Sequence, residues 1–275
     1  MRAGRFSRVA AIAVAGAVSV GVLAGCGGSS GGDNNNPPAA STPTPDANAD
    51  KAAIAANWEK FFNASTPLAK TLGGAQVLVG GVAVPLYFVS PGQINFQIPY
   101  TVTSDTTVQV VSAGQNGNIR SLSVNGAMPR LLFFVSFIAG NYGVIVNSAD
   151  GSLTLPTGTA VPGFATHPAK PGDTIVVYGI GFGATTPVAV EGQAATSSPL
   201  QRIDGTTATF GGGFGGNPVT VNSSFTGLTP TAVGLYQANV IIPATTPLGP
   251  AVPLTLKVNN VLTNNVTLAI TATGK

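Results

Sequence analysis

The chain has 275 residues and a formal net charge of +3, only 8% of its residues are charged, and its 12 Lys and Arg residues are scattered. Scattered charges of this kind form no basic patch, so the sequence gives no electrostatic indication of nucleic-acid binding. A single cysteine and a single histidine exclude an intrachain disulfide and leave too few ligands for a structural zinc site.

The first 25 residues have the pattern of a signal peptide. Residues 9–23 form an apolar stretch that is too short for a comfortable membrane span but suits a signal sequence. Small residues then lead directly into Cys26, and the segment 23–26 (LAGC) resembles the lipobox of bacterial lipoproteins. The resemblance implies cleavage before Cys26 and a diacylglycerol on its sulfur. The alternative is an ordinary secreted protein whose cysteine falls there by chance. The positive segment before the apolar stretch consists of Arg2, Arg5 and Arg8.

Cleavage before Cys26 would change the net charge of the mature chain and would indicate where the protein is located. Removal of the three leader arginines leaves nine basic and nine acidic residues, so lipid rather than charge would hold the chain to a membrane. Several acyl chains give stable anchoring where one would be marginal. We therefore expect a protein of the bacterial cell envelope whose first partner is the membrane. Gly27, where an aspartate would retain the protein, favours the outer membrane if the cell has two membranes.

Two segments separate the signal from the first predicted strand. Residues 26–50 are rich in Gly, Ser, Asn and Thr-Pro and carry no large apolar side chain, which predicts a disordered stalk. Residues 47–62 follow a helical period, and we expect this short helix to dock on the first domain, although ligand stacking by its tryptophan is the alternative. The apolar face of this helix carries Ile54, Trp58, Phe61 and Phe62.

From residue 71 onward, short β-rich runs alternate with Gly, Pro, Asn and Ser, which is typical of a β-sandwich. We predict an all-β protein with two tandem immunoglobulin-like sandwich domains, the first at 51–128 together with the helix and the second at 129–275. The predicted strands are 76–79, 85–89, 94–98, 107–112, 120–124, 131–137, 143–147, 174–179, 208–210, 219–224, 235–242, 252–258 and 266–271.

A motif of the form Gln-x-Asn-apolar-x-Ile-Pro occurs twice, which indicates a duplicated β-module. Its glutamine and asparagine alternate along a strand and therefore share one face. We expect their amides to bond to loop backbone and so to stabilise the fold; a ligand site present in both copies is the alternative. The repeated residues are Gln93, Asn95 and Pro99 in the first copy and Gln237, Asn239 and Pro243 in the second.

Three segments in the same order resemble the Solibacter-type uncharacterised C-terminal domain family: 89–99 (VSPGQINFQIP), 168–183 (PAKPGDTIVVYGIGFG) and 234–243 (GLYQANVIIP). The second is also similar to the first strand of TIG domains. The resemblance covers about 67–271 and implies tandem immunoglobulin-like sandwiches, but it brings no activity.

One feature departs from this pattern. The second copy has an opening strand at 173–179, whereas the first copy has the stalk and the helix in its place. We therefore expect the first domain to be an incomplete sandwich whose open side is covered by the helix at 47–62.

The sequence offers little catalytic chemistry. His167 lies in a loop, we expect it to be solvated and without partners, and no Gly-x-Ser-x-Gly segment supplies a nucleophile. The acidic residues show no calcium-loop spacing, although a carboxylate pair assembled in space remains open. We predict no catalytic residue, no metal and no cofactor.

The glycine-rich segment 211–216 is the candidate binding loop. Phe210 and Phe214 flank or lie within it and are the aromatic side chains it would present to a partner. In the alternative interpretation the segment is only a hairpin connection whose phenylalanines pack into the sandwich edge.

These features favour a non-catalytic, lipid-anchored envelope module that binds a glycan or another envelope protein. A structural spacer without a ligand is the second hypothesis, and an extracytoplasmic hydrolase is the third.

Overall fold

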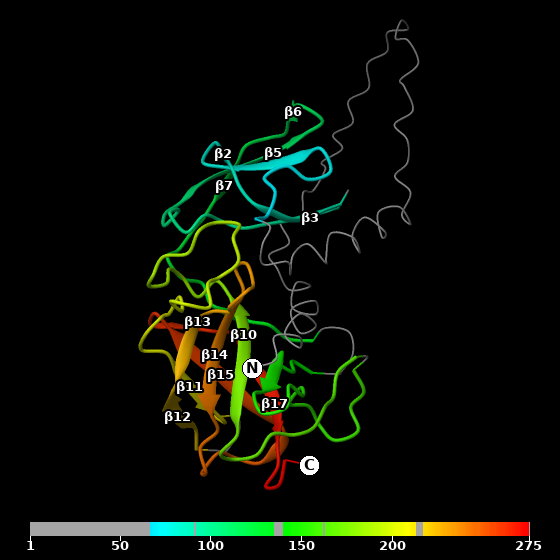
Figure 1. Ribbon diagram of the computed structural model, residues 1–275, viewed down its shortest axis with the longest axis vertical. Helices are drawn as coiled ribbons and strands as arrows, with labels where there is room; N and C mark the ends of the chain where they lie inside the picture. The colour runs from blue at the N-terminus through cyan, green and yellow to red at the C-terminus, as the bar shows by residue number, and fades with distance from the viewer. Residues whose placement is uncertain (1–66, 91, 135–139, 162, 213–216, 275) are drawn as a thin grey trace, which may run out of the picture.

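The computed structural model describes residues 67–274 except 91, 135–139, 162 and 213–216. The described residues form strands β1–β17 in antiparallel sheets and contain no helix, which confirms the predicted all-β class (Figure 1). No helix in this part of the chain could therefore cross a membrane. The signal, the stalk, Cys26 and the predicted helix at 47–62 lie outside the described residues.

The first seven strands make two small sheets, which we call the first strand set. Four strands are ordered β2-β1-β5-β6, β7 also pairs with β5, and β3 pairs with β4. Their bounds are β1 Ala75–Val79, β2 Val82–Ala83, β3 Leu86–Ser90, β4 Gln93–Phe96, β5 Thr106–Ser112, β6 Gln115–Asn116 and β7 Arg120–Leu122.

The last seven strands, the second strand set, repeat these pairings strand for strand. The order β12-β11-β15-β16 with β17 on β15 matches the first set, and β13 pairs with β14 as β3 pairs with β4. The duplication inferred from one motif therefore extends to the pairing of every strand in the set. The bounds are β11 Thr207–Phe210, β12 Val219–Asn222, β13 Phe225–Leu228, β14 Tyr236–Ile241, β15 Gly249–Val258, β16 Val261–Leu262 and β17 Val266–Ile270.

Three strands between the two sets have no counterpart in the first: β8 (Arg130–Leu131), β9 (Ile145–Asn147) and β10 (Thr174–Ile180). β10 pairs along its length with the free side of β14, from Thr174 opposite Ile241 to Gly179 opposite Tyr236. β8 and β9 pair with the other side of β10. β13 and β14 thus belong to a five-stranded sheet that includes β8, β9 and β10, whereas β3 and β4 form a two-stranded sheet.

The same two-residue turn closes the β5–β6 and β15–β16 hairpins. Both central residues have positive φ, at 48° and 76° for Ala113 and Gly114 and at 48° and 64° for Asn259 and Asn260. Such turns match the twist of the strands they join and favour Asn and Gly. Ala113 is the one residue of the four that pays a steric cost for this conformation.

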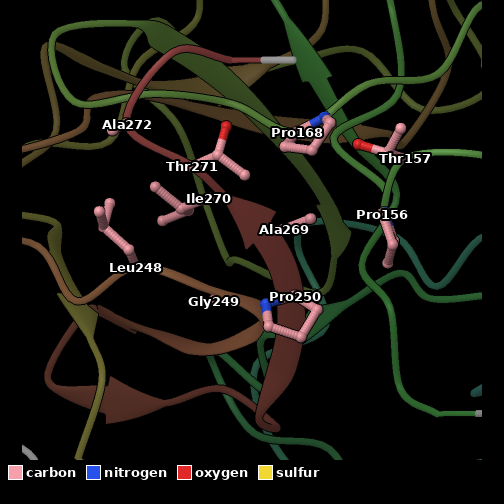
Figure 2. A pocket seen from close by; sticks show the side chains of 10 residues that line it. All are labelled: Pro156, Thr157, Pro168, Leu248, Gly249, Pro250, Ala269, Ile270, Thr271 and Ala272. Atoms are coloured by element: carbon pink, nitrogen blue, oxygen red, sulfur yellow. The ribbon is translucent and has the colours of Figure 1, made fainter.

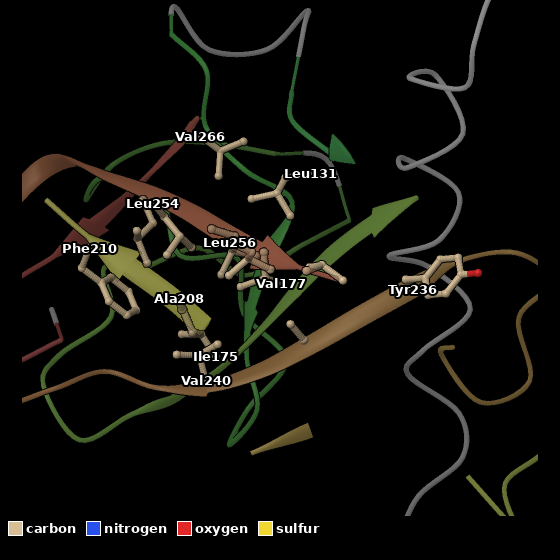
Figure 3. Close-up of a cluster of buried hydrophobic side chains, with 14 of the residues drawn as sticks. Leu131, Ile175, Val177, Ala208, Phe210, Tyr236, Val240, Leu254, Leu256 and Val266 are labelled. Carbon is tan, nitrogen blue, oxygen red and sulfur yellow. The ribbon is translucent and has the colours of Figure 1, made fainter. Parts of the chain in front are cut away.

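Three apolar clusters hold the strands together. The largest lies between the β14–β10 sheet and the β11–β15–β17 sheet, an arrangement consistent with a β-sandwich (Figure 3). A second cluster covers the opposite face of β10 with residues 132–164, so β10 is buried on both faces. The first set has a smaller cluster around Val77, Leu86 and Val108.

The predicted strands correspond to observed ones with shifts of a few residues at their ends, except for 131–137. There, β8 covers only Arg130–Leu131, Phe133 is 41% exposed, and 135–137 lie outside the described residues. β13 and three two-residue strands, β2, β6 and β16, were not predicted. The division into domains at 51–128 and 129–275 stays a prediction.

Candidate functional site

The glutamine and asparagine of the repeated motif bond to each other in both copies. Gln93 Nε2 donates to Asn95 Oδ1 at 2.7 Å, and Gln237 Nε2 donates to Asn239 Oδ1 at 2.9 Å. These side chains are two residues apart on one face of a strand, which brings their amides together. The expected bonds from these amides to loop backbone are replaced by a bond within the motif itself.

The motif prolines also have the same local role in both copies. The carbonyl of Pro99 accepts a hydrogen bond from Val102 N at 3.0 Å, and that of Pro243 accepts one from Thr246 N at 3.1 Å. Each proline therefore begins a tight turn directly after its strand. The amide pair and the proline turn therefore give the backbone the same local shape in both copies of the motif.

In the first copy the polar side chains Asn95 and Gln97 are buried, and Gln97 contacts the loop between β10 and β11. Gln97 Oε1 accepts a hydrogen bond from Gly192 N at 2.7 Å, and the Gly192 carbonyl accepts one from Leu68 N at 2.7 Å. Tyr87, on the neighbouring strand β3, donates to the carbonyl of Val233 at 2.8 Å. We call these contacts of the first strand set with the β10–β11 and β13–β14 loops the joint.

Two further tyrosines lie at the joint, where the side chains of Tyr100 and Tyr236 interact. Tyr236 donates to the carbonyl of Gly183 at 2.6 Å, and its ring stacks on Phe182 with centroids 5.1 Å apart. Burial raises the pKa of Tyr87 and of Tyr236 well above the usual range, and burial raises that of Tyr100 to about 12. These phenols therefore stay protonated and act as hydrogen-bond donors rather than as acids or bases.

His167 has hydrogen-bond partners, so the expectation of a side chain without partners was wrong, although 31% of the side chain is exposed. Its Nε2 lies 2.7 Å from Ser152 Oγ and 2.8 Å from Asp150 Oδ2, and its Nδ1 lies 2.8 Å from the Pro168 carbonyl. The Asp150 hydrogen bond and the Pro168 carbonyl raise the pKa of His167. Burial raises the pKa of Asp150, but hydrogen bonds from His167 and Ser152 outweigh it, so that pKa lies below its usual value.

This cluster does not have the geometry of a Ser–His–Asp triad. In a triad the serine and the aspartate bond to opposite ring nitrogens, so that the imidazole carries a proton between substrate and serine. Here both Ser152 and Asp150 contact Nε2, and Ser152 is only 1% exposed. The arrangement ties the loop at 150–152 to the entry of β10, and it offers no accessible nucleophile.

An apolar groove of about 410 Å³ lies between β15 and β17 of the second strand set and the segments near residues 156 and 168 (Figure 2). Leu248 borders it with 54% of its surface exposed, and the two threonine hydroxyls are its only polar side chains. The lining comes from four separate parts of the chain, which is why no sequence motif indicates it. It consists of Pro156, Thr157, Pro168, Leu248, Gly249, Pro250, Ala269, Ile270, Thr271 and Ala272.

The aromatic binding loop is corrected in part. Phe210 is 0% exposed and belongs to the large core cluster, so it cannot be presented to a partner. Its place on β11, opposite Leu254, points it between the sheets (Figure 3). Phe214 lies outside the described residues, as does Cys26.

Charged groups are sparse throughout the described residues. They contain no group of three or more His, Cys, Asp or Glu side chains able to hold a metal ion. Besides the His167–Asp150 contact, an exposed ion pair joins Arg202 Nε and Asp204 Oδ1, which lie 3.7 Å apart.

No protein-family model, no curated protein and no solved structure matches this chain.

Proposed function

We propose that this protein is a lipid-anchored, non-catalytic binding module of the bacterial cell envelope. Its anchor is Cys26, its stalk is 26–50, and its head consists of two tandem immunoglobulin-like sandwiches of the Solibacter-type family. The lipobox resemblance supports the anchor, and the three family-like segments support the head. The repeated strand pairing agrees with a duplicated sandwich module.

The groove at Leu248 carries the binding part of the proposal. Ordinary ligand sites are concave and mostly apolar, and a few polar groups orient the ligand. This groove has an exposed leucine, an isoleucine and three proline rings, but no aromatic side chain and no charged one. A sugar needs several polar partners and an aromatic face, so the lining favours an apolar side chain of another envelope protein over a glycan.

Photo-crosslinking in cells that make the protein tests this role. A photoreactive residue at Leu248 is expected to trap a discrete envelope protein, and a second substitution, Pro250→Glu, is expected to abolish that product. Leu262, which is 67% exposed on β16 and outside the groove, is the matched control position. Equal products from both positions, or none from Leu248, contradict the proposal.

A structural spacer without a ligand is the second candidate function, because the buried hydrogen bonds of the joint would suit that role. A spacer must hold its parts at a fixed angle, and the joint ties the two sets through buried hydrogen bonds at Tyr87 and Gln97. An absence of crosslinks at Leu248, together with a loss of envelope integrity on deletion of the gene, would select the spacer.

A further inference from the structure

The hydrogen bonds of His167 require a charged ring. Its Nε2 lies 2.8 Å from a carboxylate oxygen of Asp150, and its Nδ1 lies 2.8 Å from the carbonyl of Pro168. Both partners only accept hydrogen bonds, and a neutral imidazole carries a single N–H. Ser152 adds no donor to the ring, because its hydroxyl donates to Asp150 Oδ1 at 2.7 Å. Only the imidazolium donates to both sides, so the described geometry is that of protonated His167.

One peptide group links this ring to the apolar groove. The carbonyl of the Pro168–Ala169 peptide is the one that His167 Nδ1 contacts, and the N–H of the same peptide donates to the Ala269 carbonyl at 2.9 Å. Thr271 N in turn donates to the Ala169 carbonyl at 2.9 Å. Pro168, Ala269 and Thr271 all line the groove (Figure 2). The orientation of this peptide therefore determines how the groove wall at Pro168 is joined to the end of β17.

The segment that carries this peptide is also bonded on its other side. His167 N donates to the Leu153 carbonyl at 3.1 Å, and Leu153 N donates to the Ala165 carbonyl at 2.9 Å. Residues 165–169 thus lie between Leu153 and the end of β17. A change at the His167 ring can therefore reach the groove through backbone hydrogen bonds.

The charge of His167 can respond to the surrounding pH. Its side chain is 31% exposed and that of Asp150 is 52% exposed, so solvent reaches the pair. Asp150, in the loop after β9, and Asp173, just before β10, are the acidic groups that act on the ring. Lys170 is the nearest basic residue along the chain. The hydrogen bond to Asp150, together with the backbone one, raises the pKa of His167 above its ordinary value of 6.5.

Loss of the proton leaves one of the two contacts without a donor. A carboxylate accepts a stronger hydrogen bond than a carbonyl does, so the neutral ring is expected to keep its proton on Nε2, toward Asp150. The lone pair of Nδ1 then faces the Pro168 carbonyl at 2.8 Å and repels it. The peptide that joins the groove wall to β17 is therefore the part that moves.

We propose that His167 acts as a pH-dependent clamp on the groove at Leu248. Its charged ring fixes the Pro168–Ala169 peptide and with it the groove wall, and its deprotonation releases that wall and weakens binding in the groove. The loss of one hydrogen bond is expected to weaken binding about fivefold. The effect on binding rests on the function proposed above, whereas the movement of the peptide does not.

NMR spectroscopy of the intact protein in detergent tests the clamp without a ligand. His167 is the only histidine, so its ring signals need no assignment. Between pH 5.5 and pH 9, the Ala169 amide is expected to shift with the same midpoint as the ring, and the neutral ring is expected to carry its proton on Nε2. Asp150→Asn is expected to move both midpoints to lower pH. Asp204→Asn is the matched control and is expected to leave them unchanged, because Asp204 is an exposed carboxylate that pairs with Arg202.

Crosslinking in isolated envelope membranes tests the effect on binding. A photoreactive residue at Leu248 is expected to give about five times more product at pH 5.5 than at pH 9, and His167→Gln is expected to remove this difference. A ring that titrates while the Ala169 amide does not, or a neutral ring with its proton on Nδ1, overturns the clamp. So does a product whose yield is independent of pH. The absence of any product contradicts the function proposed for the groove, and the NMR titration then decides the clamp by itself.

Discussion

β4 and β14 share one motif and one amide pair but bury opposite faces. In β14 the apolar residues are buried and Gln237 and Asn239 are half-exposed, whereas in β4 Asn95 and Gln97 are buried and the apolar residues are partly exposed. The motif thus determines the local shape of the strand, while the neighbouring elements determine which face is covered. The facing sheet of β11, β15 and β17 covers the apolar face in one copy, and the loops between β10 and β11 and between β13 and β14 lie against the polar face in the other.

This difference extends to the stability of the two sets. The second set has a large core shared by two sheets. The first set has a small core and makes further buried contacts at the joint. Because buried apolar area is the dominant stabilising term, equivalent substitutions are expected to cost more in the second set.

The largest effect is expected at equivalent positions of β15 and β5. Leu256 is opposite Ala208, and Val110 is opposite Val77, so the two residues occupy the same place in their sets. Leu256 is 0% exposed, and Leu256→Ala is expected to lower the free energy of unfolding by about 3 kcal/mol. Val110 is only partly buried, and Val110→Ala is expected to cost about 1 kcal/mol. Urea denaturation measures both, and equal costs would break the comparison.

A smaller effect is expected at the joint. Gly234 has a φ of +61°, and a Cβ there would lie 2.5 Å from the Tyr87 hydroxyl. Gly234→Ala is therefore expected to cost about 2 kcal/mol, from the left-handed backbone and from displacement of Tyr87. Gly81 has a φ of +82° with nothing within 4 Å of a built Cβ, so Gly81→Ala isolates the backbone part at about 1 kcal/mol. Urea denaturation measures the loss of unfolding free energy in each variant. An equal loss in the two variants would show that the joint around Tyr87 is loosely packed.

The His167 cluster belongs to the second set alone and predicts a pH dependence. A raised pKa of His167 stabilises the fold below its ordinary value of 6.5, and this contribution is lost as the pH rises through the raised value. A lowered pKa of Asp150 stabilises the fold above 3.8 and is lost as the pH falls. The contribution is therefore largest between about pH 4 and pH 6.5.

His167→Gln tests this dependence. Since both side chains are substantially exposed, the cost near pH 5.5 is expected to be about 1 kcal/mol or less, and it should shrink in alkaline buffer. His167 is the only histidine, so a difference between variant and parent in melting temperature that changes between pH 6 and 8 reports this group. A difference that is constant with pH would contradict the assignment.

Local patterns were sufficient to predict most strands, because alternation and turn residues act within a few positions. β13 was missed because its sequence, FTGL, contains a glycine that weakens the strand pattern. The structure explains that glycine: a Cβ at Gly227 would lie 2.0 Å from the Gln201 carbonyl, so the backbones can approach here only without a side chain.

The candidate sites were less predictable, because they join distant segments. Ser152 and His167 are 15 residues apart in irregular loops, with no motif to relate them. The groove combines residues near 156 and 168 with others near 248 and 270. Gln97 could be recognised as part of a strand, but its burial depends on Gly192, 95 residues away.

The smallest effect is expected at the repeated hairpin turn, where the two sets differ by side chain alone. Ala113 has the same positive φ of 48° as Asn259, its counterpart, but lacks the tolerance of asparagine for this conformation. Ala113→Asn is therefore expected to stabilise the protein by about 0.5 kcal/mol, measured as a small rise in melting temperature. Asn259→Ala serves as the reciprocal change. It is expected to cost more than this gain, because Asn259 Nδ2 also donates to the Phe182 carbonyl at 2.8 Å. If Ala113→Asn destabilised the protein instead, the two turns would not be equivalent, and the strand-for-strand correspondence would fail at the point where the backbone angles match best.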